Sequence, residues 1–293
     1  MFSKLQKNGT PDSIERRHTH EPPGEYAHKA HRHTSLSIAS LFSPSAGRIR
    51  LGFAGSAAGA GATTLCFSAA EYLAALTGKY AKRDVTMLEL DPRAANPSGK
   101  PYDKIGIDKR FAGRDFISLY KLAAEGRPLH SVNNIDGGIN WLLRVPGEAV
   151  PAPEPSILHR LAGNAAGDII LCDISATGIL YSAGPSLDRD SLLALLADLD
   201  HIICVLDPLP SRLLASVPAV EVCRAAAASG VPITFVFNKL NAGVNLREVT
   251  RFTGVRDFIP FPALPAEVVY GAEYACRSLA PELAEPLSRL FRD

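Results

Sequence analysis

Short apolar runs alternate with segments of helical pattern from Arg48 onward, and few folds accommodate such an alternation. Most of these are continuous apolar runs, as expected for strands that helices cover on both faces. Strands that alternate with helices build a parallel sheet through βαβ units. We therefore predict an α/β fold with a doubly wound, mostly parallel sheet and helices on both faces. The predicted strands cover residues 48–54, 84–90, 139–145, 168–173, 201–207, 232–237 and 257–261.

The predicted helices lie between these runs and cover residues 63–76, 116–125, 157–164, 189–198 and 212–229. Gly230 is a suitable residue to end the last of them. The run 139–145 differs from the other strand candidates, because apolar residues alternate along it. This pattern favours a place near an edge of the sheet. The tail is apolar at a nearly helical spacing, and we expect its leucines to pack against the sheet rather than on a membrane. They are Leu279, Leu283, Leu287 and Leu290.

The first 46 residues are poor in apolar side chains and show no period, which predicts disorder. They also hold five of the eight histidines, at His18, His20, His28, His31 and His33. Imidazoles at short spacing are able to chelate a metal, but an unstructured tail is the simpler interpretation. We therefore divide the chain into a disordered, His-rich leader, residues 1–46, and one folded domain, residues 47–293.

Composition and charge argue against several other classes. The net charge is +1, so no overall field attracts nucleic acid, and Arg247, Arg251 and Arg256 are interpreted as solvated surface residues. The uncharged run 51–70 is dominated by Gly, Ala, Ser and Thr, so we expect no transmembrane segment. The N-terminus is polar, and the five cysteines form no CxxC pair. These features are typical of a cytoplasmic protein.

The stretch GFAGSAAGAGATTLCF, residues 52–67, is a glycine loop between a predicted strand and a predicted helix. α/β folds hold phosphates at this point. In one interpretation, Gly55, Gly59 and Gly61 form the G-x-x-x-G-x-G pattern of short-chain dehydrogenases, with Asp91 as the ribose ligand. Such enzymes need a tyrosine four residues before a lysine for proton transfer, and no tyrosine here has a lysine at that position. An NAD(P)-binding, dehydrogenase-like protein is therefore the alternative.

The segment SAAGAGATT resembles the deviant phosphate loop GKGGxGKTT of the ParA/MinD-type ATPases, a group of P-loop nucleotide-binding proteins. The two glycines and the two threonines match, and Ser56 replaces the first glycine of that pattern. The resemblance implies a nucleotide-binding loop formed by Ser56, Ala57, Ala58, Gly59, Ala60, Gly61, Ala62, Thr63 and Thr64.

Later motifs follow in the order of that family. MLELDPRAANPSG (87–99) resembles LLIDxDPQxN, with Glu89 in place of the first Asp, and the resemblance implies that Asp91 positions the attacking water. GDIILCD (167–173) resembles a Walker B strand, which implies that Asp173 holds Mg²⁺ through a water. Thr63 is the implied direct Mg²⁺ ligand, and Asn238 lies where the family contacts adenine. ATP and Mg²⁺ are the implied cofactors.

Both lysines of the family loop are missing, because Ala57 and Ala62 occupy their positions. A charge-assisted contact of this kind is worth about 1.5–3 kcal/mol, or roughly tenfold to a hundredfold in affinity. We therefore expect weak or absent nucleotide binding and no efficient hydrolysis, unless another cation compensates. Arg93, Lys100 and Lys104 follow the Asp91 loop and are the candidates.

The resemblance extends to function. Members of the family dimerise on ATP and position plasmids, division machinery, pili or flagella, and the TadZ/CpaE-like members tolerate irregular phosphate loops. It implies a protein partner in an assembly or positioning system and a nucleotide-dependent homodimer. A scaffold that works without nucleotide is the other hypothesis.

Overall fold

The structure is a computed structural model, and it describes residues 36–43, 46–77, 79–80, 82–90, 100–113, 115–126, 135–148, 155–174 and 189–291. Two parts of the sequence analysis lie outside these ranges. They are the leader up to residue 35 and the segment 91–99, which contains Asp91 and Arg93.

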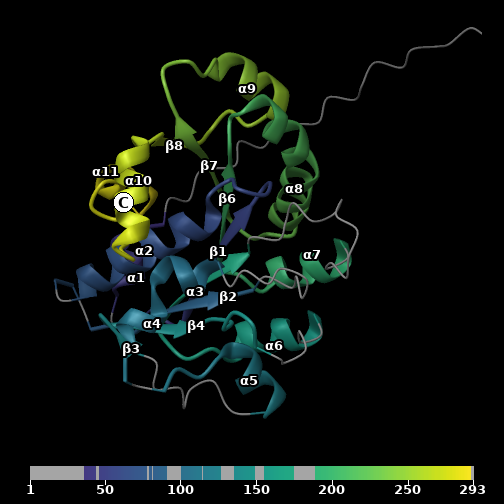
Figure 1. The fold of residues 1–293 in the computed structure, drawn as a ribbon. Coiled ribbons are helices and arrows are strands. Elements are labelled where there is room, and N and C mark those ends of the chain that lie inside the picture. The colour runs from purple at the N-terminus through teal and green to yellow at the C-terminus, as the bar shows by residue number, and fades with distance from the viewer. Residues whose placement is uncertain are drawn as a thin grey trace, which may run out of the picture. The chain divides into compact units, whose positions relative to one another are not determined.

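The strands of the described residues form one sheet in the order β3-β4-β2-β5-β1-β6-β7-β8 (Figure 1). They are β1 (Ile49–Gly55), β2 (Val85–Glu89), β3 (Ile135–Asp136), β4 (Ile139–Leu142), β5 (Ile169–Ile174), β6 (His201–Leu206), β7 (Ile233–Leu240) and β8 (Ile259–Pro262). Neighbouring strands run parallel, apart from β3, which pairs antiparallel with β4. The predicted α/β class and the mostly parallel sheet are confirmed. The two-residue strand β3 has no counterpart among the predicted strands.

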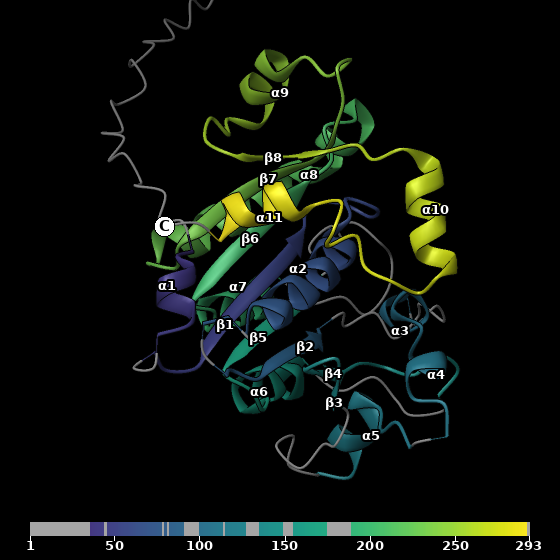
Figure 2. The same ribbon diagram turned by 90° about the vertical axis from the view of Figure 1, so that its left-hand side faces the viewer.

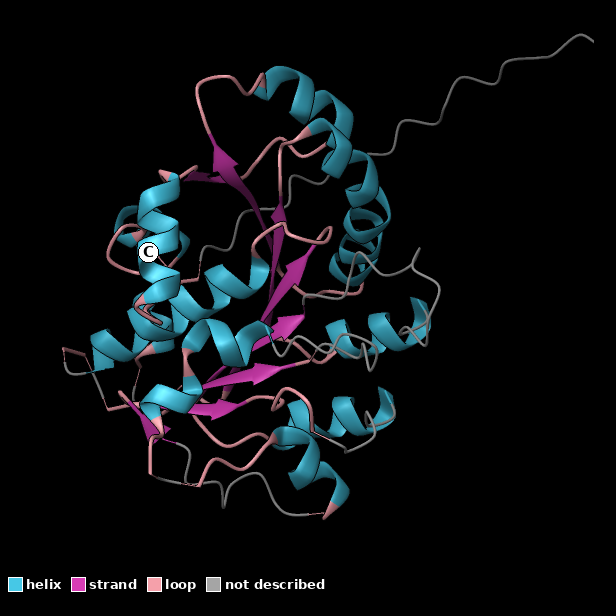
Figure 3. Cartoon of the chain, in the orientation of Figure 1, coloured by secondary structure: helices cyan, strands magenta, loops and turns pink. Residues whose placement is uncertain are grey.

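Helices cover both faces of the sheet (Figures 2 and 3). One face carries α1 (Ile38–Leu41), α2 (Ala62–Thr77), α3 (Lys100–Ile105), α4 (Ile107–Arg110), α10 (Ala266–Tyr274) and α11 (Ala284–Leu290). The other face carries α5 (Leu119–Ala124), α6 (Pro155–Asn164), α7 (Arg189–Ala197), α8 (Pro210–Ala228) and α9 (Leu246–Thr253). No helix within the described ranges is both long and apolar enough to span a membrane.

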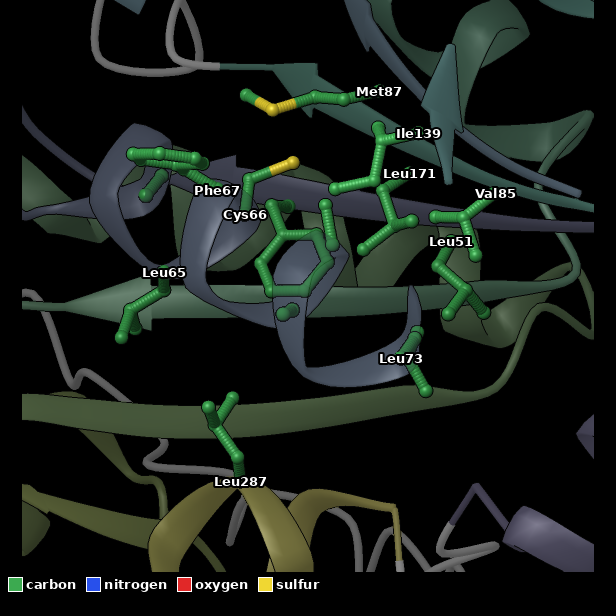
Figure 4. Close-up of a cluster of buried hydrophobic side chains, with 14 of the residues drawn as sticks. Leu51, Leu65, Cys66, Phe67, Leu73, Val85, Met87, Ile139, Leu171 and Leu287 are labelled. Carbon is green, nitrogen blue, oxygen red and sulfur yellow. The ribbon is translucent and has the colours of Figure 1, made fainter. Parts of the chain in front are cut away.

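Each strand divides its side chains between two cores, since successive residues point to opposite faces. On β5, Leu171 packs on the α2 side, whereas Ile170 and Cys172 pack on the α8 side. Figure 4 shows the first core, where Leu171 lies among Phe67 and Cys66 of α2. All four residues of β4 are buried, so this strand lies next to the edge but is covered on both faces.

The folded part of the chain begins before the predicted boundary at residue 46. Residues 38–41 form α1, where the backbone N–H of Ile38 donates to the carbonyl of Phe291 over 2.9 Å. Nη1 of Arg83 donates to the carbonyl of Leu41 over 2.6 Å, and Leu41 is buried. These contacts attach residues 36–43 of the predicted leader to the domain.

The C-terminal leucines pack as expected. The four predicted leucines are buried, and Leu287 reaches the core from α11 (Figure 4). Pro286 lies in the first turn of α11, where a missing N–H breaks no intrahelical hydrogen bond. The expectation that this tail packs against the sheet is confirmed.

Candidate functional site

The glycine loop connects the end of β1 to the start of α2. Gly59 and Gly61 have φ values of +74° and +96°, in the left-handed region that favours glycine. A Cβ on Gly61 would lie 2.3 Å from Nδ2 of Asn238, and a Cβ on Gly59 would lie 2.6 Å from Nη1 of Arg212. Both positions therefore require glycine, because of their backbone and because of their neighbours.

The two alanines at the lysine positions differ little in burial. Ala57 is 6% exposed and Ala62 is 4% exposed, so both methyl groups pack into the domain. The hydroxyl of Ser56 is also buried, and its Oγ lies 2.8 Å from Oγ of Ser216 on α8. The loop itself thus contributes no cation. The buried alanines and the hydroxyl pair between Ser56 and Ser216 hold it against the domain.

Asp173 lies beside the loop, since β5 is a direct neighbour of β1. The register places Asp173 opposite Phe53 of β1 and Glu89 of β2, and its side chain is fully buried. Burial raises the pKa of the Cys66 thiol, and the Asp173 carboxylate raises it further. The carboxylate therefore acts on the first turns of α2, the helix that carries Thr63 in its first turn.

Asn238 and Lys239 contact the loop backbone from β7. Nδ2 of Asn238 donates to the carbonyl of Ala60 over 2.9 Å, and Nζ of Lys239 donates to the carbonyl of Gly59 over 2.5 Å. Lys239 has a φ of +61°, which is uncommon for a residue with a side chain. It lies where the pairing of β7 with β8 shifts in register, and this irregularity directs its side chain to the loop.

Asp207 joins two cations at the loop. The carboxylate is buried at the end of β6, and its Oδ2 lies 3.0 Å from Nζ of Lys239 and 3.5 Å from Nε of Arg212. The sequence analysis did not select Asp207 or Arg212. The sequence did indicate Asp207, because this residue ends a predicted strand at the carboxyl edge of a parallel sheet, where α/β proteins hold ligands.

Lys104 brings a further cation to the loop from α3. Its Nζ donates to Oγ1 of Thr64 over 3.0 Å and lies 2.8 Å from Oε1 of Glu273 on α10. Of the three candidate cations, Lys104 thus reaches the first turn of α2. Arg93 and the side chain of Lys100 lie outside the described residues.

Glu89 replaces the first aspartate of the family motif and is bound to a neighbouring strand. Its Oε1 lies 3.6 Å from Nη2 of Arg144, and its Oε2 accepts a hydrogen bond from the backbone N–H of Arg144 over 3.0 Å. Both side chains are buried, with 3% and 9% exposed. Glu89 is therefore part of an ion pair between β2 and the segment after β4.

These residues fit a phosphate chain with Mg²⁺. The glycine positions form a cradle that a Cβ would fill, and the loop opens the 16-residue helix α2, whose dipole favours an anion. Thr63 supplies a hydroxyl and Asp173 a carboxylate, which are oxygen ligands of the kind Mg²⁺ prefers. The cations come from α3, α8 and β7 instead of the loop.

No protein-family model and no curated protein matches the sequence. Solved structures match the fold. A ParA family ATPase from Chlorobium tepidum is 16% identical, with a TM-score of 0.61 over 83% of this chain and 97% of that chain. The fold is that of the ParA and MinD proteins. The septum site-determining protein MinD of Pyrococcus horikoshii, complexed with Mg-ADP, is 17% identical, with a TM-score of 0.56 over 83% and 92% of the two chains. The MinC:MinD complex of Aquifex aeolicus is 12% identical, with a TM-score of 0.57 over 83% and 92%.

The sheet order argues against the dehydrogenase alternative. In the dinucleotide-binding fold the first strand lies next to the second, in the order 3-2-1-4-5-6. Here β5 lies between β1 and β2, and it places Asp173 directly beside the strand that leads into the loop. The glycine loop thus has the strand environment of the ParA/MinD fold.

Proposed function

We propose that this chain binds a nucleotide with Mg²⁺ at its glycine loop and positions or scaffolds a cellular machine, with weak or absent hydrolysis. The observation that carries the proposal is the meeting of three sequence segments at one edge of the sheet. The loop, Asp173 of β5 and the Asn238–Lys239 pair of β7 come together there. Mg-ADP is bound in the MinD structure from Pyrococcus horikoshii, which has the same fold.

Weak hydrolysis follows from the absence of a loop cation. Hydrolysis develops negative charge on the phosphate oxygens in the transition state, and fixed cations stabilise that charge. Ala57 and Ala62 supply none, and Lys239 and Arg212 already pair with Asp207. In this proposal Asp91 positions the attacking water, as the family motif implies, but turnover is slow.

A protein partner and a nucleotide-dependent homodimer belong to the same proposal. The MinC:MinD cell division protein complex of Aquifex aeolicus contains a chain with this fold. We place the chain with the TadZ/CpaE-like members, because they tolerate irregular phosphate loops. The machine is a pilus-assembly, partition or division system.

Calorimetric titration of the full chain with ATP and Mg²⁺ tests the proposal, with phosphate release measured in parallel. We expect saturable binding that requires Mg²⁺ and is lost in Asp173→Ala, with little phosphate release above the buffer rate. Light scattering with and without ATP then reports the dimer. No binding at millimolar ATP would leave only the nucleotide-independent scaffold, and tight binding of NADH would restore the dehydrogenase alternative.

A further inference from the structure

A cavity of about 860 Å³ lies between α8, α9 and the segment after β7. Figure 1 shows α8 and α9 side by side, and their residues are in contact. Leu209, Leu214 and Phe252 contribute apolar side chains to its walls. We call this cavity the α8–α9 groove, and all the residues that line it are described.

Exposed apolar side chains concentrate on the two helices that form the groove. Large hydrophobic residues that are exposed within the described ranges fall into two sets. Three are tyrosines elsewhere on the surface, which carry a polar hydroxyl. The other five all belong to α8, α9 and the residue before α8: Leu209, Leu214, Val217, Leu246 and Phe252, with 53%, 67%, 37%, 41% and 48% exposed. Apolar side chains gathered in this way mark an interaction site.

The shape of the surface suits a helix. Leu213 and Leu214 line the groove from α8, and Val249 and Phe252 line it from α9. A groove between two helices receives the apolar stripe of an amphipathic helix, whose anchors recur every three or four residues. An extended peptide would instead need a free sheet edge, and the strand residue that lines the groove, Lys239, belongs to β7, an interior strand of the sheet.

The charged residues that line the groove indicate which kind of partner helix fits it. Asp207, one of the two acids that line the groove, already pairs with Lys239 and Arg212. The second acid, Glu248, lies on α9 near Arg251, and both side chains are exposed. Three cations, Arg212, Lys239 and Arg251, thus line the groove with two acids, and this excess of positive charge complements an acidic partner.

We propose that the α8–α9 groove binds an acidic amphipathic helix of a partner protein. The proposal names the partner class for the positioning role and rests on that part of the proposed function, but not on nucleotide binding. Lys239 links the groove to the loop, because its Nζ contacts both Asp207 and the carbonyl of Gly59. A helix bound in the groove would therefore lie next to a side chain that also contacts the glycine loop.

A phage-displayed library of helical 16-residue peptides, selected on the nucleotide-free full chain, tests the proposal. Without counter-selection, the enriched clones are then measured on the double variant Leu214→Glu, Phe252→Glu, which changes two exposed side chains and should leave the melting temperature unchanged. Tyr274→Glu, an exposed aromatic position on α10, is the matched control. We expect enriched peptides with apolar residues every three or four positions and an excess of Asp and Glu. They should bind the control as they bind the wild type and lose at least tenfold in affinity on the double variant.

Charge reversal gives a second, independent measurement. Arg251→Glu should weaken the selected acidic peptides at low salt and leave the melting temperature unchanged. Peptides that are basic, or that bind the double variant equally well, would overturn the proposal. So would sedimentation that shows a wild-type dimer and a monomeric double variant, because the groove would then be an interface between two copies. These outcomes do not depend on ATP, so failure of the ATP titration leaves the test intact.

Discussion

Nζ of Lys104 donates a hydrogen bond to Oγ1 of Thr64 over 3.0 Å, which brings a cation from α3 to the first turn of α2. The same ammonium group lies 2.8 Å from a carboxylate oxygen of Glu273 on α10. A loop that lacks both of its expected lysines thus has a lysine at its helix end, supplied by another element. A phosphate bound at the loop and Glu273 would compete for this cation.

Lys104→Ala should lower the affinity for MgATP. If Lys104 compensates for the missing loop lysines, its loss removes a charge-assisted contact worth about 1.5–3 kcal/mol, or roughly tenfold to a hundredfold in the dissociation constant. Calorimetric titration measures the change. Lys109→Ala is the matched control, because Lys109 on α4 is exposed and contacts the carbonyl of Tyr274 rather than the loop. Equal affinities of the two variants would show that Lys104 takes no part in binding.

Ala62→Lys should have the opposite effect. It restores a lysine where the family loop has one, and we expect MgATP affinity to rise by about tenfold or more. Phosphate release should rise as well, since the cation also stabilises transition-state charge. Ala58→Lys is the control, because it adds the same charge at an exposed loop position that is not a lysine position of the family. An unchanged affinity in Ala62→Lys would mean that the missing lysine does not limit binding.

The fold could be predicted because the buried strands appear in the sequence as continuous apolar runs between helical segments. This pattern is typical of a parallel sheet that helices cover on both faces. The candidate site could be predicted where a motif carries it, as at the loop and Asp173. Lys239 could not, because the sequence favours a solvated lysine after Asn238. Its position at the loop depends on a positive φ and a register shift in β7, and neither leaves a residue signature.

The sequence analysis also missed short helices, among them α9. Helix α9 has a capping Asn245 and ends at Gly254 in the left-handed conformation, so its boundary signals are present in the sequence. Its eight residues are too few for the 3.6-residue period to stand out, and only Val249 and Thr253 of them are buried. The remaining apolar residues of α9 face solvent, which is what makes the groove beside it visible only in the structure.

Arg144→Ala should destabilise the domain strongly. The substitution removes the guanidinium that pairs with the buried carboxylate of Glu89, and breaking a buried ion pair costs about 3–5 kcal/mol. Urea unfolding followed by circular dichroism measures the free energy of unfolding. The control is Arg289→Ala, which removes an exposed ion pair with Glu285 on α11 and should cost less than about 0.5 kcal/mol. A loss in Arg144→Ala as small as in the control would contradict the burial of this pair.

The buried thiols should be unreactive in the folded chain. Burial raises the pKa of Cys66 and raises that of Cys172 to about 12, and a hydrogen bond with Cys223 raises the pKa of Cys204. A thiol whose pKa lies well above the working pH holds almost no thiolate, which is the form that reacts. At pH 8, a disulfide reagent such as DTNB should therefore label no more than one thiol rapidly per native chain.

That thiol should be Cys276, the cysteine whose side chain is only partly buried. Cys276→Ser should abolish the rapid phase, and guanidinium should expose all five thiols of the wild type. Raising the pH from 7 to 9 should recruit no second thiol, because burial blocks access as well as ionisation. Rapid labelling of Cys66 in the native chain would show instead that α2 opens from β5, and with it the helix that begins at the glycine loop.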